Sequence, residues 1–138
     1  GQYSDLNFEG KKVPISKIIN MQIKKTGKLF SFCCMAPAVV SKKKKYIKKF
    51  DKIGSNIGLL FQIADDLIDY NGNTKKVGKK TKKDFKKGKA TLISLLGPQN
   101  TILYGNKLKY KIFSELKYFG NKAKDLKSTI SYILERSK

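Results

Sequence analysis

The sequence predicts an all-α protein, a bundle of about six helices. Apolar residues recur at helical spacing along most of the chain, whereas the alternation typical of strands is nearly absent. Only three prolines interrupt the 138 residues. An apolar content of 40% is enough for a packed core, and the length fits one domain or part of one.

Two helices are predicted in the N-terminal third of the chain. The first spans Ser16 to Thr26, with Ser16 as its N-cap and three isoleucines on one side, Ile18, Ile19 and Ile23. The second begins at Gly27 and is apolar on every side from Leu29 to Ala36, which is typical of a buried helix. Pro37 predicts a kink or an end in this helix.

A longer helix is predicted from about Lys42 to Tyr70, and the dipeptide Asn71-Gly72 predicts its end. The next 16 residues, Thr74 to Lys89, include nine lysines and almost no core-forming side chains. They predict a loop that faces solvent or a ligand. Helical patterns resume in three segments: Thr91 to Leu96, about Gln99 to Phe119, and about Asp125 to Arg136.

The net charge of +21 is extreme for this size, and three interpretations compete. Such a chain binds nucleic acid, or it binds anionic membranes or diphosphate substrates, or lysine simply keeps it in solution. Only Arg136 among the 31 basic residues is an arginine, whereas base reading and bidentate phosphate contacts favour arginine. We therefore expect no nucleic-acid partner, a solvated role for most lysines and diphosphate contacts for a few.

The composition excludes several other classes of protein and site. No apolar run is long enough to span a bilayer, and Gly1 to Asp5 is unlike a signal peptide. The absence of histidine excludes His-based catalytic triads and His-ligated metal sites. Cys33 and Cys34 are adjacent in an apolar stretch, and they predict small buried side chains in a reducing compartment, the cytoplasm.

A candidate site lies on the predicted long helix. At about 100° per residue, Asp69 lies about 40° and Asp66 about 100° from Asp65 around the helix axis. Gln62 lies about 60° from Asp65 on the same scale, so all four polar side chains share one stripe. The other sides of this helix are apolar, which is typical of a helix inside a bundle.

Three carboxylates on such a stripe are expected to line a cavity, where they repel one another and where burial opposes their ionisation. They either take up protons or recruit cations, and an all-oxygen cluster suits Mg²⁺. Gly54 and Gly58 fall on or beside the stripe and suggest that room is needed above it. The alternative is an exposed acidic patch at a helix end. Lys79 and Lys89 follow the site, and on spacing alone they indicate only solvated lysines.

The stretch from Gly58 to Tyr70 resembles the second aspartate-rich motif of the trans-prenyl diphosphate synthases, the family of the farnesyl and geranylgeranyl diphosphate synthases. Other pieces match that family in order along the whole chain: Gly1-Gln2 with Asp5-Leu6, Lys25-Thr26-Gly27, Gly78-Lys79 with Asp84, Gly88-Lys89-Ala90-Thr91, and Arg136-Ser137-Lys138. The combination of FQ-x-x-DD-x-x-D with the later GK and GKAT is highly specific.

The resemblance implies that residues 1–138 are the C-terminal part of one all-α domain of the isoprenoid synthase fold, which is homodimeric in its full-length form. It implies a prenyltransferase that joins an allylic diphosphate, dimethylallyl or geranyl, to isopentenyl diphosphate and gives a farnesyl- or geranylgeranyl-type product. Ionisation of the allylic diphosphate would be assisted by Mg²⁺.

Residue roles also follow from the resemblance. Asp65 would bind Mg²⁺ directly, with Asp66 and Asp69 completing the site and Asp84 supporting the waters of the metal. The allylic diphosphate would be held by Lys25, Thr26, Gln62, Lys79 and Lys89, of which Lys25 and Lys79 would act in catalysis with the three carboxylates. Arg136 and Lys138 would approach isopentenyl diphosphate.

Two departures from the family pattern bear on activity. Lys82-Lys83 stand where the family usually has glycine before Asp84. The first aspartate-rich motif and the basic residues that grip isopentenyl diphosphate are missing and would lie upstream of Gly1, so the chain alone is expected to bind metal poorly and to turn over little. The alternatives are a basic helical module that binds nucleic acid, a non-catalytic synthase subunit, and a terpene cyclase, which usually lacks the second motif with GK and GKAT.

Overall fold

The protein is described by a computed structural model, which covers residues 1–77 and 89–136, with side chains at 1–72 and 89–136. All regular structure in these residues is helical, which confirms the predicted fold class. The elements in order are α1 (Gln2–Phe8), α2 (Ile15–Gln22), the π-helical turn η1 (Ile23–Gly27), α3 (Lys28–Val40), α4 (Lys44–Val77), α6 (Leu92–Leu96), α7 (Pro98–Leu116), the 3-10 segment η3 (Lys117–Ala123) and α8 (Lys124–Glu135).

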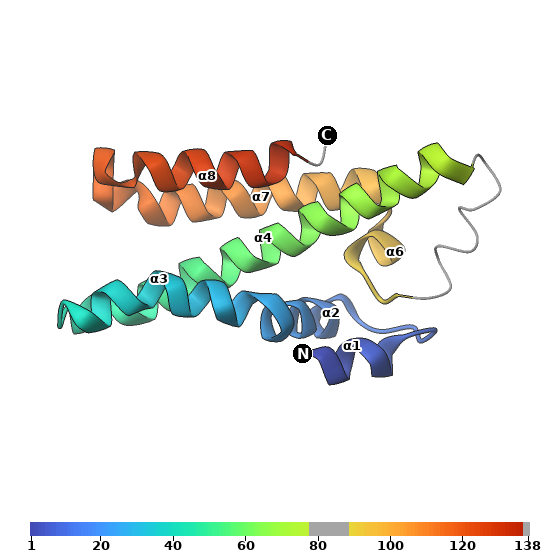
Figure 1. The fold of residues 1–138 in the computed structure, drawn as a ribbon, viewed down its shortest axis with the longest axis horizontal. Helices are drawn as coiled ribbons and strands as arrows, with labels where there is room; N and C mark the ends of the chain where they lie inside the picture. The colour runs from blue at the N-terminus through green and yellow to red at the C-terminus, as the bar shows by residue number, and fades with distance from the viewer. Residues whose placement is uncertain (78–88, 137–138) are drawn as a thin grey trace.

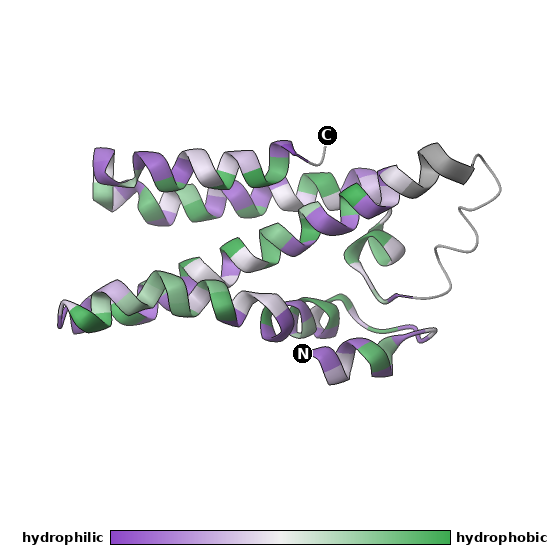
Figure 2. Cartoon of the chain, viewed as in Figure 1, coloured by the Kyte–Doolittle hydropathy of each residue, from purple (hydrophilic) through white to green (hydrophobic). Residues whose placement is uncertain are grey.

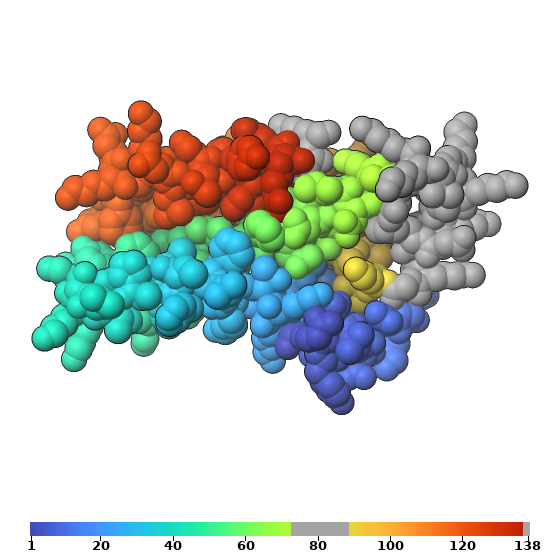
Figure 3. All heavy atoms as spheres, in the orientation of Figure 1, coloured from blue at the N-terminus to red at the C-terminus, as the bar shows by residue number. Residues whose placement is uncertain are grey.

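Helix α4 runs through the middle of the molecule (Figure 1). Helix α3 packs antiparallel to it along one side, and this is the most extensive contact between two elements. The antiparallel pair α7 and α8 covers the other side, as the space-filling view also shows (Figure 3). Helices α2 and α6 contact α4 as well. No helix in the described part of the chain combines the length and apolar character needed to cross a membrane.

The core is built around α4. Its fully buried side chains include Ile53, Leu60 and Ile63, which pack with Ile112 of α7 and Ile130 of α8. Burying each such side chain stabilises the fold by about 1.5–3 kcal/mol relative to leaving it in water. The apolar stripe predicted for the long helix is therefore the spine of the bundle, and it fixes how the polar side chains on the same helix are presented.

Gly54 and Gly58 let α3 approach α4 at backbone distance. A Cβ atom on Gly54 would lie 2.5 Å from the carbonyl oxygen of Phe30, and one on Gly58 would lie 2.5 Å from the Cα atom of Gly27. The room that the sequence suggests above these glycines is taken by the backbone of α3 and of the adjoining turn η1.

Helix α3 is not the fully buried helix that its composition predicts. Apolar residues line most of its length (Figure 2), but only one face packs on α4. Leu29, Phe32 and Val40 are 68%, 60% and 82% exposed, and Cys33 is exposed as well. Together with Val39 they form an apolar stripe over three turns, the α3 outer face, which no described residue covers. The prediction counted apolar residues and could not tell which neighbours are present.

Helix α4 continues beyond its predicted end. Asn71 and Gly72 are helical, and α4 runs to Val77. Gly72 does not adopt a positive φ, so the dipeptide is not used as a C-cap. The cost of glycine in a helix is roughly 1 kcal/mol, which the backbone hydrogen bonds of a long helix can outweigh. The N-cap prediction at Ser16 is also wrong, because α2 begins at Ile15 after Pro14.

The downstream helices agree with the sequence patterns apart from their ends. Thr91 caps α6 and forms a capping box with Ser94, so that each side chain accepts a hydrogen bond from the backbone N–H of the other. Helix α7 ends at Leu116, where the tighter 3-10 segment η3 begins. Within η3 the backbone leaves helical geometry at Gly120, which has a φ of 52°.

Replacing Gly54 with alanine should lower the free energy of unfolding by roughly 1–3 kcal/mol, because the new methyl group meets the backbone of α3. Gly72→Ala is the matched control in the same helix. Its methyl group would meet nothing within 4 Å, so it should raise stability by roughly 0.5–1 kcal/mol. Urea unfolding followed by circular dichroism measures both changes. Equal effects of the two substitutions would contradict this account of the α3–α4 contact.

Candidate functional site

Asp66 of α4 is held between two glutamine side chains. Gln62 lies one turn earlier on α4, and its Nε2 donates to Oδ1 of Asp66 at 3.0 Å. Gln22 at the end of α2 donates from Nε2 to Oδ2 of Asp66, also at 3.0 Å. Each carboxylate oxygen therefore has its own amide donor, and the two donors come from different helices.

The π-helical turn η1 brings Lys25 and Thr26 to the same place. The Oγ1 atom of Thr26 donates to Oε1 of Gln62 at 3.0 Å. The ammonium group of Lys25 pairs with Asp5 of α1, with 2.5 Å between Nζ and Oδ2. Lys25 and Thr26 are adjacent in the sequence, and the turn directs them to α1 and α4 respectively.

Several predicted site residues line one small cavity of about 30 Å³, which we call the Asp66 cavity. Its walls come from α1, α2, η1, α4 and the segment before α6. The lining residues are Asp5, Met21, Gln22, Lys25, Gln62, Asp66, Lys89, Ala90 and Thr91. The fold thus gathers four predicted residues from positions 25 to 89.

Burial raises the pKa of the Asp66 carboxyl from 3.8 to about 6. The hydrogen bond from Gln62 opposes this shift, the charges of Asp69 and Asp65 add to it, and the nearby ammonium group of Lys89 opposes it. Asp66 is therefore an anion that the protein only partly compensates, and a nearby cation would favour its ionised form.

Asp65 points to a different neighbour. Its Oδ1 atom accepts a hydrogen bond from Nη2 of Arg136 at 2.6 Å, and 39% of its side chain is exposed. The guanidinium group of Arg136 also lies over the ring of Phe61, with 4.3 Å between its Cζ atom and the ring centroid. The residue predicted to approach isopentenyl diphosphate thus contacts the first carboxylate of the acidic motif.

The three carboxylates do not line one cavity, contrary to the sequence expectation. Asp66 faces the Asp66 cavity, Asp65 faces Arg136, and Asp69 is exposed. The reason is the angle of about 100° between neighbouring residues of a helix, which sends Asp65 and Asp66 to different partners. Within residues 1–72 and 89–136 there is no group of three or more side chains arranged to hold a metal ion.

The predicted roles of Lys79, Asp84 and Lys138 fall outside the described residues. Lys89 lies inside them, exposed at the edge of the Asp66 cavity. The structure therefore assembles Lys25, Thr26, Gln62 and Lys89 around Asp66.

Sequence reasoning assigned no role to Gln22, Asp5 or Thr91. Gln22 did carry a signal, because an amide lies four residues after the buried Ile18 on the packed face of α2. Asp5 belongs to the GQ-x-x-DL stretch, but its ion pair with Lys25 depends on the packing of α1 against α2. No local pattern could identify that contact.

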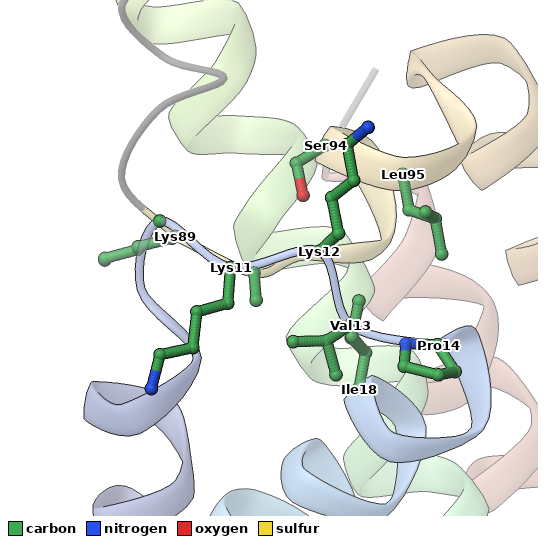
Figure 4. Close-up of a pocket in the computed structure, with 10 residues that line it drawn as sticks. Lys11, Lys12, Val13, Pro14, Ile18, Lys89, Ser94 and Leu95 are labelled. Atoms are coloured by element: carbon green, nitrogen blue, oxygen red, sulfur yellow. The ribbon is translucent and has the colours of Figure 1, made fainter.

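A larger open hollow of about 690 Å³ lies nearby, between the segment after α1 and helix α6 (Figure 4). Its walls include Val13, Pro14, Ile18 and Leu95, and the lysines Lys11, Lys12 and Lys89 belong to its lining. Among the described residues, no carboxylate lines this hollow.

Curated relatives match essentially the whole chain. A farnesyl diphosphate synthase of Micrococcus luteus is 31% identical, over 100% of this chain and 48% of that protein. A geranylgeranyl diphosphate synthase of Cyanophora paradoxa is 35% identical, over 99% of this chain and 46% of that protein. The chain therefore spans about half the length of these relatives.

The fold is similar to that of a solved Helicobacter pylori geranyltransferase complexed with magnesium and isoprenyl diphosphate. The TM-score is 0.74 at 26% sequence identity, and the match covers 97% of this chain and 44% of that chain. The isoprenoid synthase fold implied by the sequence resemblance is thus confirmed.

The family model of the polyprenyl synthetases matches residues 1–101, from α1 into the first turn of α7. This range contains the acidic motif on α4, the Lys25-Thr26 pair and Lys89. The motifs, the fold and the relatives agree, and the chain belongs to the polyprenyl synthetase family.

Proposed function

We propose that this chain contributes the allylic diphosphate site of a Mg²⁺-dependent trans-prenyl diphosphate synthase. In this proposal an allylic diphosphate, dimethylallyl or geranyl, is joined to isopentenyl diphosphate to give a farnesyl- or geranylgeranyl-type diphosphate. The main observation in support of this proposal is that Lys25, Gln62, Asp66 and Lys89 line one cavity. The relatives named farnesyl and geranylgeranyl diphosphate synthases support the same reaction class.

The donor set fits Mg²⁺. This ion is usually held by one or two carboxylates, and waters and substrate phosphates complete its octahedral shell. Asp65 and Asp69 supply two carboxylates one helical turn apart, both with exposed surface. Asp66 adds a third negative charge beside them. Few protein ligands are therefore needed, and the diphosphate supplies the rest.

The side chains of this chain would act on the diphosphate from several directions. The ammonium groups of Lys25 and Lys89 would donate hydrogen bonds to its oxygens, and these charge-assisted bonds strengthen as negative charge builds on the leaving group. Gln62 and Thr26 would orient the anion from the floor of the site. Bound Mg²⁺ would supply Lewis-acid stabilisation of the departing pyrophosphate.

After the allylic diphosphate ionises, the proposed reaction needs an apolar enclosure, which the described residues form only on one side. The α3 outer face is apolar, it begins at Leu29 three residues after Thr26, and no described residue covers it. A prenyl chain and the carbocation formed at its end need an apolar enclosure that excludes water. We propose that the other half of the synthase closes over this face and brings the first acidic motif. A cytoplasmic homodimer is part of the same proposal.

Asp65→Ala should remove most of the Mg²⁺-dependent binding of a non-hydrolysable prenyl diphosphate analogue, because it deletes a direct cation ligand. We expect affinity to fall by about tenfold or more, as measured by calorimetry with and without Mg²⁺. Asp125→Ala is the matched control, since it removes the same charge from an exposed position on α8. Identical heats for parent and Asp65→Ala would count against the site. Binding that ignores Mg²⁺ and falls steeply with salt would instead indicate a nucleic-acid module.

The purified chain alone should show little or no multiple-turnover prenyl transfer, because the proposed reaction also needs the first acidic motif and the basic residues that hold isopentenyl diphosphate. The assay would supply geranyl diphosphate, radiolabelled isopentenyl diphosphate and Mg²⁺, with the Micrococcus luteus synthase as the positive control. Product formed over many turnovers by this chain would refute the proposal that a second half is required.

The stability of the metal-free chain should depend on Asp66 between about pH 4 and pH 6. The folded-state pKa is raised, so the folded chain holds a proton that the unfolded chain has lost. This stabilisation is complete below the unfolded pKa and is lost as the pH rises through about 6. Relative to Asp66→Asn, the parent should lose roughly 2–3 kcal/mol between pH 4 and pH 7 in urea unfolding. A difference between the two proteins that does not change with pH would contradict the shift.

A further inference from the structure

Gln22 occupies a position where an amide side chain is costly. It lies at the end of α2 on the face that packs against the rest of the bundle, with Ile18 and Met21, and only 2% of its surface is exposed. Burying an amide is unfavourable unless its hydrogen bonds are made, whereas an apolar side chain would pack there without that penalty. The presence of glutamine therefore needs an explanation beyond packing.

The partner of Gln22 is the central carboxylate of the acidic motif. Gln22 donates to Oδ2 of Asp66 and Gln62 donates to Oδ1, both at 3.0 Å. Because the two donors come from different helices, the carboxylate cannot turn about its Cβ–Cγ bond without breaking one of the bonds. Gln22 thus removes a degree of freedom that Gln62, on the same helix as Asp66, could not remove alone.

The hydrogen bonds around Asp66 extend to both sides. Thr26 donates to Oε1 of Gln62, which leaves the amide nitrogen of Gln62 directed at Asp66. On the other side, Oε1 of Gln22 is buried and has no partner among the described residues. Gln22 lines the Asp66 cavity, whose volume of about 30 Å³ is enough for one water molecule. Lys25 and Lys89 line the same cavity.

We propose that Gln22 is a positioning residue for the divalent cation: it fixes the orientation of the Asp66 carboxylate and thereby raises the cation affinity of the acidic motif. Partners in the outer shell of a metal site orient the groups that face the ion, and their loss typically weakens metal affinity. This inference rests on the proposed function, because it requires that the motif on α4 bind a cation.

The test uses Mn²⁺ alone as the probe, with the free ion counted by electron paramagnetic resonance in titrations of the full 138-residue chain. Gln22→Met keeps the length and helix propensity of the side chain but removes the amide. It should weaken Mn²⁺ affinity about tenfold. Gln22→Asn keeps a polar amide, withdraws it from Asp66 by one methylene and should weaken affinity in the same direction, so the test does not depend on one variant folding. Gln99→Met, at an exposed position on α7, is the matched control and should bind as the parent does.

A double-mutant cycle separates positioning from simple structural support. If Gln22 acts through Asp66, then Gln22→Met should cause no further loss of Mn²⁺ affinity in a chain that already carries Asp66→Asn. Gln22 variants that lower the unfolding temperature but bind Mn²⁺ as tightly as the parent would overturn the proposal, because Gln22 would then be only a core residue. An equal loss of affinity on Gln22→Met in the parent chain and in the chain that carries Asp66→Asn would overturn it too.

Asp65→Ala distinguishes failure of this inference from failure of the proposed function. If Asp65→Ala binds Mn²⁺ as the parent does, the motif is not a cation site, and both proposals fail together. If Asp65→Ala loses the site while the Gln22 variants retain it, only the positioning role of Gln22 is refuted. Both proposals are supported if Asp65→Ala and the Gln22 variants all lose Mn²⁺ affinity and Gln22→Met causes no further loss in the chain that carries Asp66→Asn.

Discussion

The contact between α3 and α4 is the constraint on which the candidate site depends. Gly54 and Gly58 bring the two backbones together, and the Gly58 contact falls on Gly27, the residue after Thr26. The Thr26–Gln62 hydrogen bond lies one turn beyond that contact on α4. If α3 stood further from α4, η1 would move away as well, and Lys25 and Thr26 would no longer lie beside the acidic motif. The close packing that Gly54 and Gly58 allow thus determines where Lys25 and Thr26 lie relative to the acidic motif.

The site contains several carboxylates whose charge is partly offset by other side chains of the protein. Asp5 forms an ion pair with Lys25, Asp65 forms one with Arg136, and Asp66 accepts hydrogen bonds from two amide groups. These contacts offset part of the charge of three carboxylates, two of which belong to the α4 motif, although the raised pKa of Asp66 shows that the compensation is incomplete. A divalent cation with an attached diphosphate would bring positive charge to the carboxylates and negative charge to the lysines. Such a ligand matches both halves of the charge pattern.

Helix α3 buries one side against α4, whereas its opposite side, the α3 outer face, is exposed and apolar. Exposed apolar side chains from Leu29 to Val40 form a continuous stripe rather than scattered positions. The relatives are about twice as long as this chain, which agrees with a bundle that needs further helices on that side. The stripe begins at Leu29, close to Lys25 and Thr26, so under the proposed function the same surface would also enclose an apolar substrate chain.

Local patterns predicted much of this protein. Hydrophobic periodicity identified the helices other than α1 because a core stripe imposes a period of 3.6 residues. The motif on α4 identified the family because its residue types and spacing are rare together. The ends of helices were predicted less well: Gly72 continues α4 because local propensity is weaker than an extended ladder of hydrogen bonds.

Only the tertiary structure decided which groups meet. The roles of Gly54 and Gly58, the ion pair of Asp5, and the pairing of Gln22 with Asp66 all depend on segments from different parts of the chain. The spacing of residues along one helix gives their angles around its axis, but it does not say which residues of other helices face them. The sequence therefore determined the elements and the chemistry they carry, whereas packing between helices determined the contacts, because those contacts arise from the whole bundle at once.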